Sequence, residues 1–422
     1  PSERRSRILA GLEREAERHD GRCVPDSGLL EEVVFLAEHP VVLSGSFDRE
    51  FLELPREVVT TAMRSHQRYF SVETEQGELL PHFLFVGDGE WEEREQVVTG
   101  NERVLRARLA DARFYWDMDL KKGLDALAEE LGGIVWLEAL GSLSDKAERV
   151  TQLSDRLGRT WYADSWSGLR EEALRAARLA KADLGSEMIK DGKEFTGLQG
   201  TIGARYAEAQ GEGPVVAGAL AEQYLPRGAG DPLPQSPAGT VLAAADRLDT
   251  VAGCWAAGFV PSGSQDPYAL RRAANGFVRI LLEKELHLAL GEMVGEAVAQ
   301  LPEDAKKEDL PGELLGFFRD RIAWALRERD ISYDVVDAVL AANSDDPMDA
   351  MIRAEALQAI RGEEELERLV VGFKRAANIL KGIDENELPD PGGVDWKETH
   401  AAEQGLQEAV TRVREELVEA GL

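Results

Sequence analysis

Cysteine and histidine are scarce in this chain, and long apolar runs are missing. Only Cys23 and Cys254 are present, and the six histidines are scattered. Two distant cysteines exclude a disulfide framework and a cysteine-based zinc site, and they fit a reducing compartment. No apolar stretch approaches the roughly 20 residues that a membrane span requires, and no signal-peptide pattern stands at the start. We therefore expect a cytoplasmic protein without a membrane partner or a bound metal.

The phosphate-binding and nucleophile motifs of common enzymes are also missing. The sequence contains no G-x-x-x-x-G-K-[ST] loop, no G-x-G-x-x-G and no serine nucleophile elbow. A formal net charge of −30 argues against indiscriminate binding of nucleic acids, since their phosphates repel such a chain, but it leaves room for a local basic surface. We expect no cofactor and no ATP site in this chain, which is typical of a recognition protein or a non-catalytic subunit.

The first part of the chain combines helical and strand patterns. Alternating residues at 68–73 and 80–86, with a turn at Gln76–Gly77 between them, predict a β-hairpin. We further expect helices at 1–20, 55–67 and 97–109, and a strand at 32–43 that is interrupted at His39–Pro40. The fold class is therefore predicted to be α+β, with a mixed α/β region at residues 1–160.

Helical patterns dominate the remaining sequence. Breaks are expected at Gly192, 211–214, 227–239 and 259–267. Amphipathic helices with short acidic turns follow, and ELPDPGG at 387–393 has the composition of a linker. The predicted domains after the first region are a helical domain at 161–285, a helical linker domain at 286–386, and the start of a C-terminal helical region at 387–422.

Four segments gather basic or hydrogen-bonding side chains in this acidic chain. Each can grip phosphate or stack bases, and each can equally be a solvated face with ordinary ion pairs. The candidate residues are Arg64, His66, Gln67 and Arg68 in the first segment, Asn101, Arg103, Arg106 and Arg113 in the second, Arg271 and Arg272 in the third, and Lys374 and Arg375 in the fourth.

The second and third segments also allow structural interpretations. In the second, Glu102 and Asp111 are available to neutralise the arginines as ordinary ion pairs. In the third, Asp266 precedes Pro267, which predicts a capped helix that starts at this point. Adjacent helical residues diverge by about 100°, so one arginine of the Arg271–Arg272 pair can serve structure while the other faces outward.

A further cluster is similar to a metal site that has lost its ligands. A helical region with an early and a late Asp resembles the His-Asp (HD) phosphohydrolases, in which adjacent His and Asp hold a metal that activates water. Here Ala182 precedes Asp183, and alanine has no lone pair for a metal; the late Asp lies in ADRLD at 245–249. We expect Asp183 to cap or to form an ion pair, and the alternative function is an HD-type metal-dependent nucleotide phosphohydrolase.

Nine blocks in this order resemble the beta subunit of the bacterial heterotetrameric glycyl-tRNA synthetases, over roughly residues 30–385. The blocks are EHPVVLSGSFDREFLELPREVV (38–59), MRSHQRYFSVE (63–73), GNERVLRARLADARFYWDMD (100–119), LGSLSDKAERV (140–150), AARLAKADLGSEM (176–188), LQGTIGARYAEAQGE (198–212), EQYLPRGAGDPLP (222–234), ADRLDTVAGCWAAGFVPSGSQDPYALRRAANGFVRIL (245–281) and VGFKRAANIL (371–380).

The resemblance implies a subunit that binds tRNA(Gly) while a separate alpha subunit uses ATP and Mg to activate glycine, in a heterotetramer of two alpha and two beta subunits. It also implies a degenerate HD-like domain at 161–285, and it makes the four basic segments candidate contacts for tRNA or for the alpha subunit. Family chains extend further at both ends and carry an anticodon-binding domain after FKRAANIL, so we expect this chain to be a fragment. A small insertion at Lys190–Lys193 also departs from the family, and we assign it no function.

Overall fold

The computed structural model describes residues 1–65, 67–89, 92–381 and 400–419 of the chain. The chain divides into two compact units, Pro1–Ala356 and Leu357–Leu422. The finer domain boundaries expected from the sequence at residues 160, 285 and 386 stay predictions.

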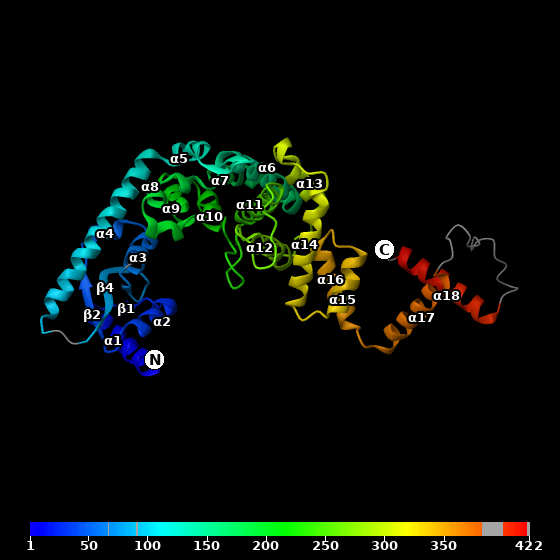
Figure 1. Ribbon diagram of the computed structural model, residues 1–422, viewed down its shortest axis with the longest axis horizontal. Coiled ribbons are helices and arrows are strands. Elements are labelled where there is room, and N and C mark those ends of the chain that lie inside the picture. Colours follow the sequence, from blue (N-terminus) through cyan, green and yellow to red (C-terminus); the bar gives the residue numbers. More distant parts are fainter. Residues whose placement is uncertain (66, 90–91, 382–399, 420–422) are drawn as a thin grey trace. The chain divides into compact units, whose positions relative to one another are not determined.

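A four-stranded antiparallel sheet opens the first unit (Figure 1). The strands have the spatial order β1-β3-β4-β2, and β3 pairs with β4 as the predicted hairpin, with Phe70 opposite Leu84. The strands are β1 (Arg22–Cys23), β2 (Pro40–Ser46), β3 (Phe70–Glu73) and β4 (Leu79–Asp88), and the elements around them are α1 (Ser2–Glu17), α2 (Ser27–Leu36), the 3-10 helix η1 (Arg49–Glu53) and α3 (Arg56–Arg64).

The core of this region lies between the sheet and helices α1 and α2. Ile8 and Leu12 from α1 pack with Leu29 from α2 and with strand residues such as Val42 and Leu84. A Cβ atom at Gly11 would lie 2.5 Å from Cγ2 of Val42, so only glycine lets α1 approach β2 this closely. The apolar spacing at 1–20 thus forms the predicted helix and decides which of its faces is buried.

The prediction of a strand at 32–43 is wrong for the first half of that range. Helix α2 continues to Leu36, and β2 begins only at Pro40. The Asp26 side chain caps α2 by accepting the backbone N–H of Leu29. Leu30 and Val34 lie one helical turn apart and are both buried, so a run rich in Val and Leu fits a helix here as well as it fits a strand.

Helix α4 (Arg94–Lys122) carries the chain from the sheet to the helical part, and it is longer at both ends than the helix expected at 97–109. Near its end, the buried Asp119 carboxylate accepts the backbone N–H groups of Glu187 and Met188 and the hydroxyl of Tyr206 at 2.6 Å. These bonds cap the first turn of α8 (Glu187–Lys190). One carboxylate therefore ties α4 to two segments of the helical part.

The rest of the first unit is mainly helical and is organised around α11 (Pro237–Ala256). Almost every residue of α11 is buried, and it contacts α6, α7, α10, α12, α13 and α14. The remaining elements are α5 (Leu124–Glu130), η2 (Leu131–Gly133), β5 (Val135–Leu137), β6 (Gly141–Ser142), α6 (Leu143–Trp161), α7 (Ala163–Leu179), η3 (Ala182–Gly185), η4 (Lys193–Leu198), α9 (Thr201–Ala209), α10 (Pro214–Glu222), α12 (Leu270–Glu283), α13 (Leu290–Ala299), η5 (Glu303–Ala305), α14 (Leu310–Arg327), α15 (Tyr333–Ala342) and α16 (Pro347–Ala359).

The predicted succession of an α+β start and a mostly helical remainder is confirmed. The expected breaks at Gly192 and 259–267 fall between helices, and those at 211–214 and 227–239 do so up to their last residues, because α10 begins at Pro214 and α11 at Pro237. The short β5–β6 pair is not visible in the sequence pattern. The second unit contains α17 (Glu364–Leu380) and α18 (Ala401–Glu419). None of the helices in the described residues has both the length and the apolar content of a membrane span.

Candidate functional site

The arginines of the first basic segment are held by carboxylates from helix α2 or its cap. Arg64 donates from Nε to Oδ2 of Asp26 at 2.6 Å, and Arg68 donates to Glu32 at 2.5 Å. Burial acts to raise the pKa of Asp26, but the bonds from Arg64 and from the α2 backbone outweigh it and hold this pKa below its ordinary value. His66 lies outside the described residues.

The two amide residues among the candidates serve the fold. The hydroxyl of Tyr69 donates to Oδ1 of Asn101 at 2.6 Å, and Asn101 donates to the carbonyl of Val97 one turn earlier. Gln67 accepts a longer bond from the same hydroxyl at 3.5 Å. Burial raises the pKa of Tyr69 to about 12, so the hydroxyl stays a donor at neutral pH. These bonds join the start of β3 to α4.

The arginines of α4 divide into paired and unpaired groups. Arg106 forms an ion pair with Asp48 at 3.2 Å, and Arg113 donates to Glu53 at 3.0 Å and to a backbone carbonyl of η1. The partners are therefore not the Glu102 and Asp111 considered from the sequence. Arg103 is exposed and has no partner among the residues that the structure describes.

Both arginines of the third segment are free of carboxylate partners within the described part of the chain. Arg272 is exposed and Arg271 is partly exposed. Asp266 was expected to cap their helix, and its carboxylate does accept the backbone N–H groups of Leu270 and Arg271 at 2.7 and 3.0 Å, but the residue at the N-cap position is Ala269. The helix itself begins later than expected, at Leu270, because the residue before it, Ala269, has a left-handed backbone with φ of 53°.

These two arginines line adjoining cavities beside α12. A cavity of about 770 Å³ extends between α12 and α14 and includes both Arg271 and Arg272 in its wall. A smaller one of about 320 Å³ lies toward Tyr224 and Asp246 and shares Arg272 with the first. Arg272 therefore lines both cavities, a position from which its guanidinium can contact a ligand in either one.

The fourth segment lies in the second unit. Lys374 and Arg375 are exposed on α17, and neither has a partner among the described residues. Apolar side chains of the same helix are exposed as well, since Phe373 and Leu380 are 74% and 47% accessible.

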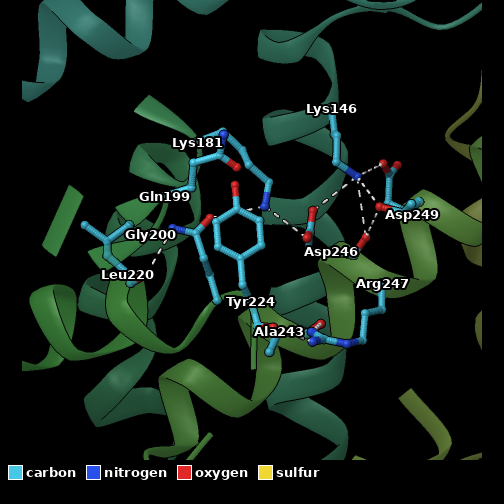
Figure 2. Close-up of polar contacts among 12 residues, drawn as sticks. Lys146, Lys181, Gln199, Gly200, Leu220, Tyr224, Ala243, Asp246, Arg247 and Asp249 are labelled. Atoms are coloured by element: carbon cyan, nitrogen blue, oxygen red, sulfur yellow. Dashed lines mark hydrogen bonds and ion pairs between the residues drawn. The ribbon is translucent and has the colours of Figure 1, made fainter. Parts of the chain in front are cut away.

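A cluster of buried charged side chains lies elsewhere, between α6 and α11 (Figure 2). The ammonium group of Lys146 is 2.8 Å from Asp249 and 3.2 Å from Asp246, and that of Lys181 is 2.9 Å from Asp246. Arg149 donates to Asp249 at 2.6 Å. All five side chains are buried, and three cations share two carboxylates away from water.

The charges of this buried cluster shift one another's protonation. Burial acts to lower the pKa of Lys146, but Asp246 and Asp249 outweigh it and hold this pKa above its ordinary value. For Lys181 burial prevails, and its pKa lies below the ordinary value. Burial acts to raise the pKa of Asp246, yet the two ammonium groups hold it well below its usual range.

Asp183 is structural and forms no ion pair with the residues that the structure describes. Its Oδ2 accepts the backbone N–H of Gly200 at 2.5 Å, which holds the start of α9. Burial raises the pKa of Asp183 above its ordinary value, and Ala182 beside it is fully buried. Within the described ranges, no three His, Cys, Asp or Glu side chains are grouped as metal ligands.

Sequence reasoning missed the cations of the buried cluster. Lys181 stands directly before Ala182 in LAKADLG, and Lys146 lies in LSDKAERV. For Lys181 the flanking alanines were the available signal, because long charged side chains are rarely buried unless they are paired; Lys146 follows Asp145 and gave no such signal. Trp324 in the wall of the larger cavity gave no such signal.

Comparison with known proteins identifies the family. Residues 1–341 match the family model described as "Glycyl-tRNA synthetase beta subunit". The chain belongs to the glycyl-tRNA synthetase beta subunit family.

Members of this family are similar along most of the chain. The beta subunit of glycine–tRNA ligase from Geotalea uraniireducens is 43% identical over 92% of this chain and 56% of its own length. The Desulforamulus reducens beta subunit is 42% identical over 99% of this chain and 59% of its own length, and that of Shouchella clausii is 44% identical over 90% and 54%. The chain therefore spans somewhat more than half the length of the curated relatives that it matches.

Proposed function

We propose that this chain is a tRNA-binding, non-catalytic part of a cytoplasmic glycine–tRNA ligase. In this proposal it binds tRNA(Gly), while a separate alpha subunit activates glycine with ATP and Mg, within a heterotetramer of two alpha and two beta subunits. The observation that carries the proposal is the family match over residues 1–341, together with relatives that are named beta subunits of this ligase.

The distribution of free guanidinium groups supports the role in RNA binding. Arg103, Arg271 and Arg272 have no carboxylate partner among the described residues, although the chain carries a net charge of −30. Unpaired arginines attract a polyanion locally even on an acidic protein, and their planar donors fit phosphate oxygens. Arg64, Arg68, Arg106 and Arg113 are engaged within the chain, and we assign them first to stability.

We further propose that the helices around α11 form a degenerate HD-like domain. Asp246 is the late Asp that would bind a metal in an active HD enzyme. Here its carboxylate forms ion pairs with the ammonium groups of Lys146 and Lys181 instead. This favours a structural core over the alternative of a metal-dependent phosphohydrolase. Metal analysis of the purified chain and hydrolysis assays with nucleotides and added Mn or Mg test this alternative directly.

Two assays test the proposed division of labour. Glycine-dependent exchange of pyrophosphate into ATP is measured for the chain alone, for the alpha subunit from the same organism, and for both together. We expect no exchange by the chain alone and co-purification of the two proteins. Exchange by the chain alone would refute the proposal.

Binding of tRNA is measured in parallel by filter titration at several salt concentrations. We expect affinity to fall steeply as salt rises, because contacts between arginine and phosphate release counterions. An acidic tRNA-sized polymer without bases serves as the control for charge alone.

A further inference from the structure

The cavity between α12 and α14, which we term the α12–α14 cavity, carries an excess of positive charge that the fold does not use. Its volume is about 770 Å³, and its wall includes Arg271, Arg272, Arg279 and Arg329. Arg271 and Arg272 have no side-chain partner within the described residues, so two guanidinium groups remain available to a ligand. A volume in this range is that of a small-molecule or nucleotide site rather than of a single ion.

All but one of the other charged side chains of the wall are engaged among the described residues. Arg279 donates to Glu283 at 2.6 Å and to the carbonyl of Ala229 at 3.0 Å, so it fixes the wall. Arg329 lies 3.9 Å from the same Glu283. The Asp266 carboxylate accepts two backbone N–H groups at the start of α12. Among the described residues of the wall, Glu328 is the one carboxylate without such a contact.

The wall also offers an aromatic face and an unsatisfied hydrogen-bond acceptor. Trp324 on α14 is 40% exposed, although it lines the cavity. The Oδ1 atom of Asn275 on α12 is buried and has no hydrogen-bond partner among the described residues. A buried acceptor without a partner is unfavourable unless a ligand supplies a donor, and an amide and an indole in the wall of one cavity match the edge and the face of a nucleobase.

We propose that the α12–α14 cavity binds one unpaired nucleotide of an RNA strand. Arg271 and Arg272 hold its flanking phosphates, Trp324 stacks on the base, and Asn275 accepts a hydrogen bond from the base edge. This inference deepens the proposed function and depends on it for the identity of the RNA as tRNA. Unpaired bases fit here because a base within a duplex exposes neither its face nor its pairing edge.

The test measures fluorescence anisotropy of a labelled single-stranded RNA hexamer, a duplex of the same sequence and whole tRNA, each with the full chain. The variants are Arg271→Gln/Arg272→Gln, Trp324→Leu and Trp324→Phe. Arg319→Gln is the matched control, because this arginine is exposed on the same helix as Trp324 and lies outside the cavity wall. Thermal melts of every variant report folding, and the conservative Trp324→Phe keeps the test decisive if Trp324→Leu is unstable.

We expect Trp324→Leu to weaken binding of the single strand by about tenfold and Trp324→Phe to restore most of the affinity, since any aromatic ring stacks on a base. The arginine double variant should weaken it by about tenfold or more. It should also make binding less dependent on salt. The slope of log K against log salt concentration should fall in magnitude by about 0.7 for each phosphate that the protein no longer neutralises. The control should bind normally, and the duplex should bind weakly to all forms.

Three results would overturn the inference. The variants could bind the hexamer and tRNA as the unchanged chain does, which would leave tRNA binding by the chain intact. The duplex could bind as tightly as the single strand. An acidic peptide could displace the labelled RNA while Trp324→Leu leaves RNA binding unchanged. That result would assign the cavity to an acidic protein partner. Failure of the chain to bind whole tRNA at all is a separate result, and it would refute the proposed function as well.

Discussion

The ammonium nitrogen of Lys181 lies 2.9 Å from Oδ2 of Asp246, and both side chains are buried. Lys181 also sits 3.9 Å above the ring of Tyr224, and its backbone is left-handed with φ of 69° (Figure 2). A non-glycine residue in this conformation is unfavourable unless its surroundings hold it there. The ion pair therefore fixes the turn between α7 and η3 to the central helix α11.

Breaking this ion pair should destabilise the protein strongly. Asp246→Asn should lower the free energy of unfolding by about 3–5 kcal/mol, because it leaves the buried ammonium groups of Lys146 and Lys181 without the carboxylate that they share. Lys181→Met should lower it by less, because Asp246 keeps its ion pair with Lys146. Their double variant should lose less than the sum of both, with a coupling of about 1–3 kcal/mol, measured by urea unfolding. Additive losses would contradict the pairing.

An exposed pair provides the control for that cycle. Arg327 and Asp337 are 3.4 Å apart, and more than half of each side chain is accessible. Arg327→Met should change stability by less than about 1 kcal/mol, since solvent screens such pairs.

The Asp155 carboxylate should make stability depend on acid. It accepts bonds from Arg170 at 2.7 Å, from Trp166 at 3.0 Å and from Arg159 at 3.0 Å, and the Arg170 bond does most to hold its pKa well below the ordinary value. A carboxyl whose pKa is lower in the folded state contributes stability above the unfolded pKa and loses it as pH falls through the folded pKa.

Asp155→Asn is therefore expected to be less stable than the unchanged chain at pH 7, with a difference that shrinks progressively below about pH 4. Urea midpoints recorded from pH 7 to pH 2 measure this. Asp111→Asn, at an exposed position without a described partner, should show a constant and small difference. A gap between Asp155→Asn and the unchanged chain that stays constant down to pH 2 would argue against this role.

A methyl group at Gly276 should disturb the buried arginine that shapes the cavity region. A Cβ there would lie 2.7 Å from Nε of Arg247, which donates to the carbonyls of Ala243, Tyr224 and Pro226. The guanidinium cannot retreat without breaking these bonds, so Gly276→Ala should lower the free energy of unfolding by about 1–3 kcal/mol.

Gly316→Ala on α14 gives the opposite expectation. Apart from its chain neighbours and the backbone of its own helix, no atom lies within 4 Å of a Cβ built at Gly316, and alanine favours a helix over glycine by about 0.5–1 kcal/mol. Thermal melts should therefore rise for Gly316→Ala and fall for Gly276→Ala. Equal shifts for both would remove the steric argument.

Two arginines of α4 should separate RNA binding from stability. Arg103 has no described partner, so Arg103→Gln should weaken tRNA binding by about 1–2 kcal/mol and leave the melting temperature unchanged. Arg113 bonds to Glu53 and to η1, so Arg113→Gln should lower the melting temperature and leave the affinity for tRNA nearly unchanged. Filter binding and thermal melts on the same samples measure both effects. A lower melting temperature with unchanged tRNA affinity for Arg103→Gln would assign Arg103 to the stability of the fold.

The hairpin β3–β4 and the breaks between helices could be predicted because they depend on local patterns of apolar residues and turn residues. The helix at Ser27–Leu36 could not, because a short apolar run satisfies both periods and only packing against α1 and the sheet selects one. Helix α12 begins later than its sequence predicts because Ala269 adopts a left-handed backbone conformation, which is unfavourable for alanine.

By itself, the sequence determined the α+β start with its mostly helical remainder, the family and the absence of a His before Asp183, because each depends on local sequence patterns. Only the tertiary structure decided which charges remain free. Arg64 meets Asp26 across 38 positions and Lys181 meets Asp246 across 65, whereas Arg271 and Arg272 meet no carboxylate in the described residues. Coulomb attraction acts through distance in space, and folding alone brings distant residues within that distance.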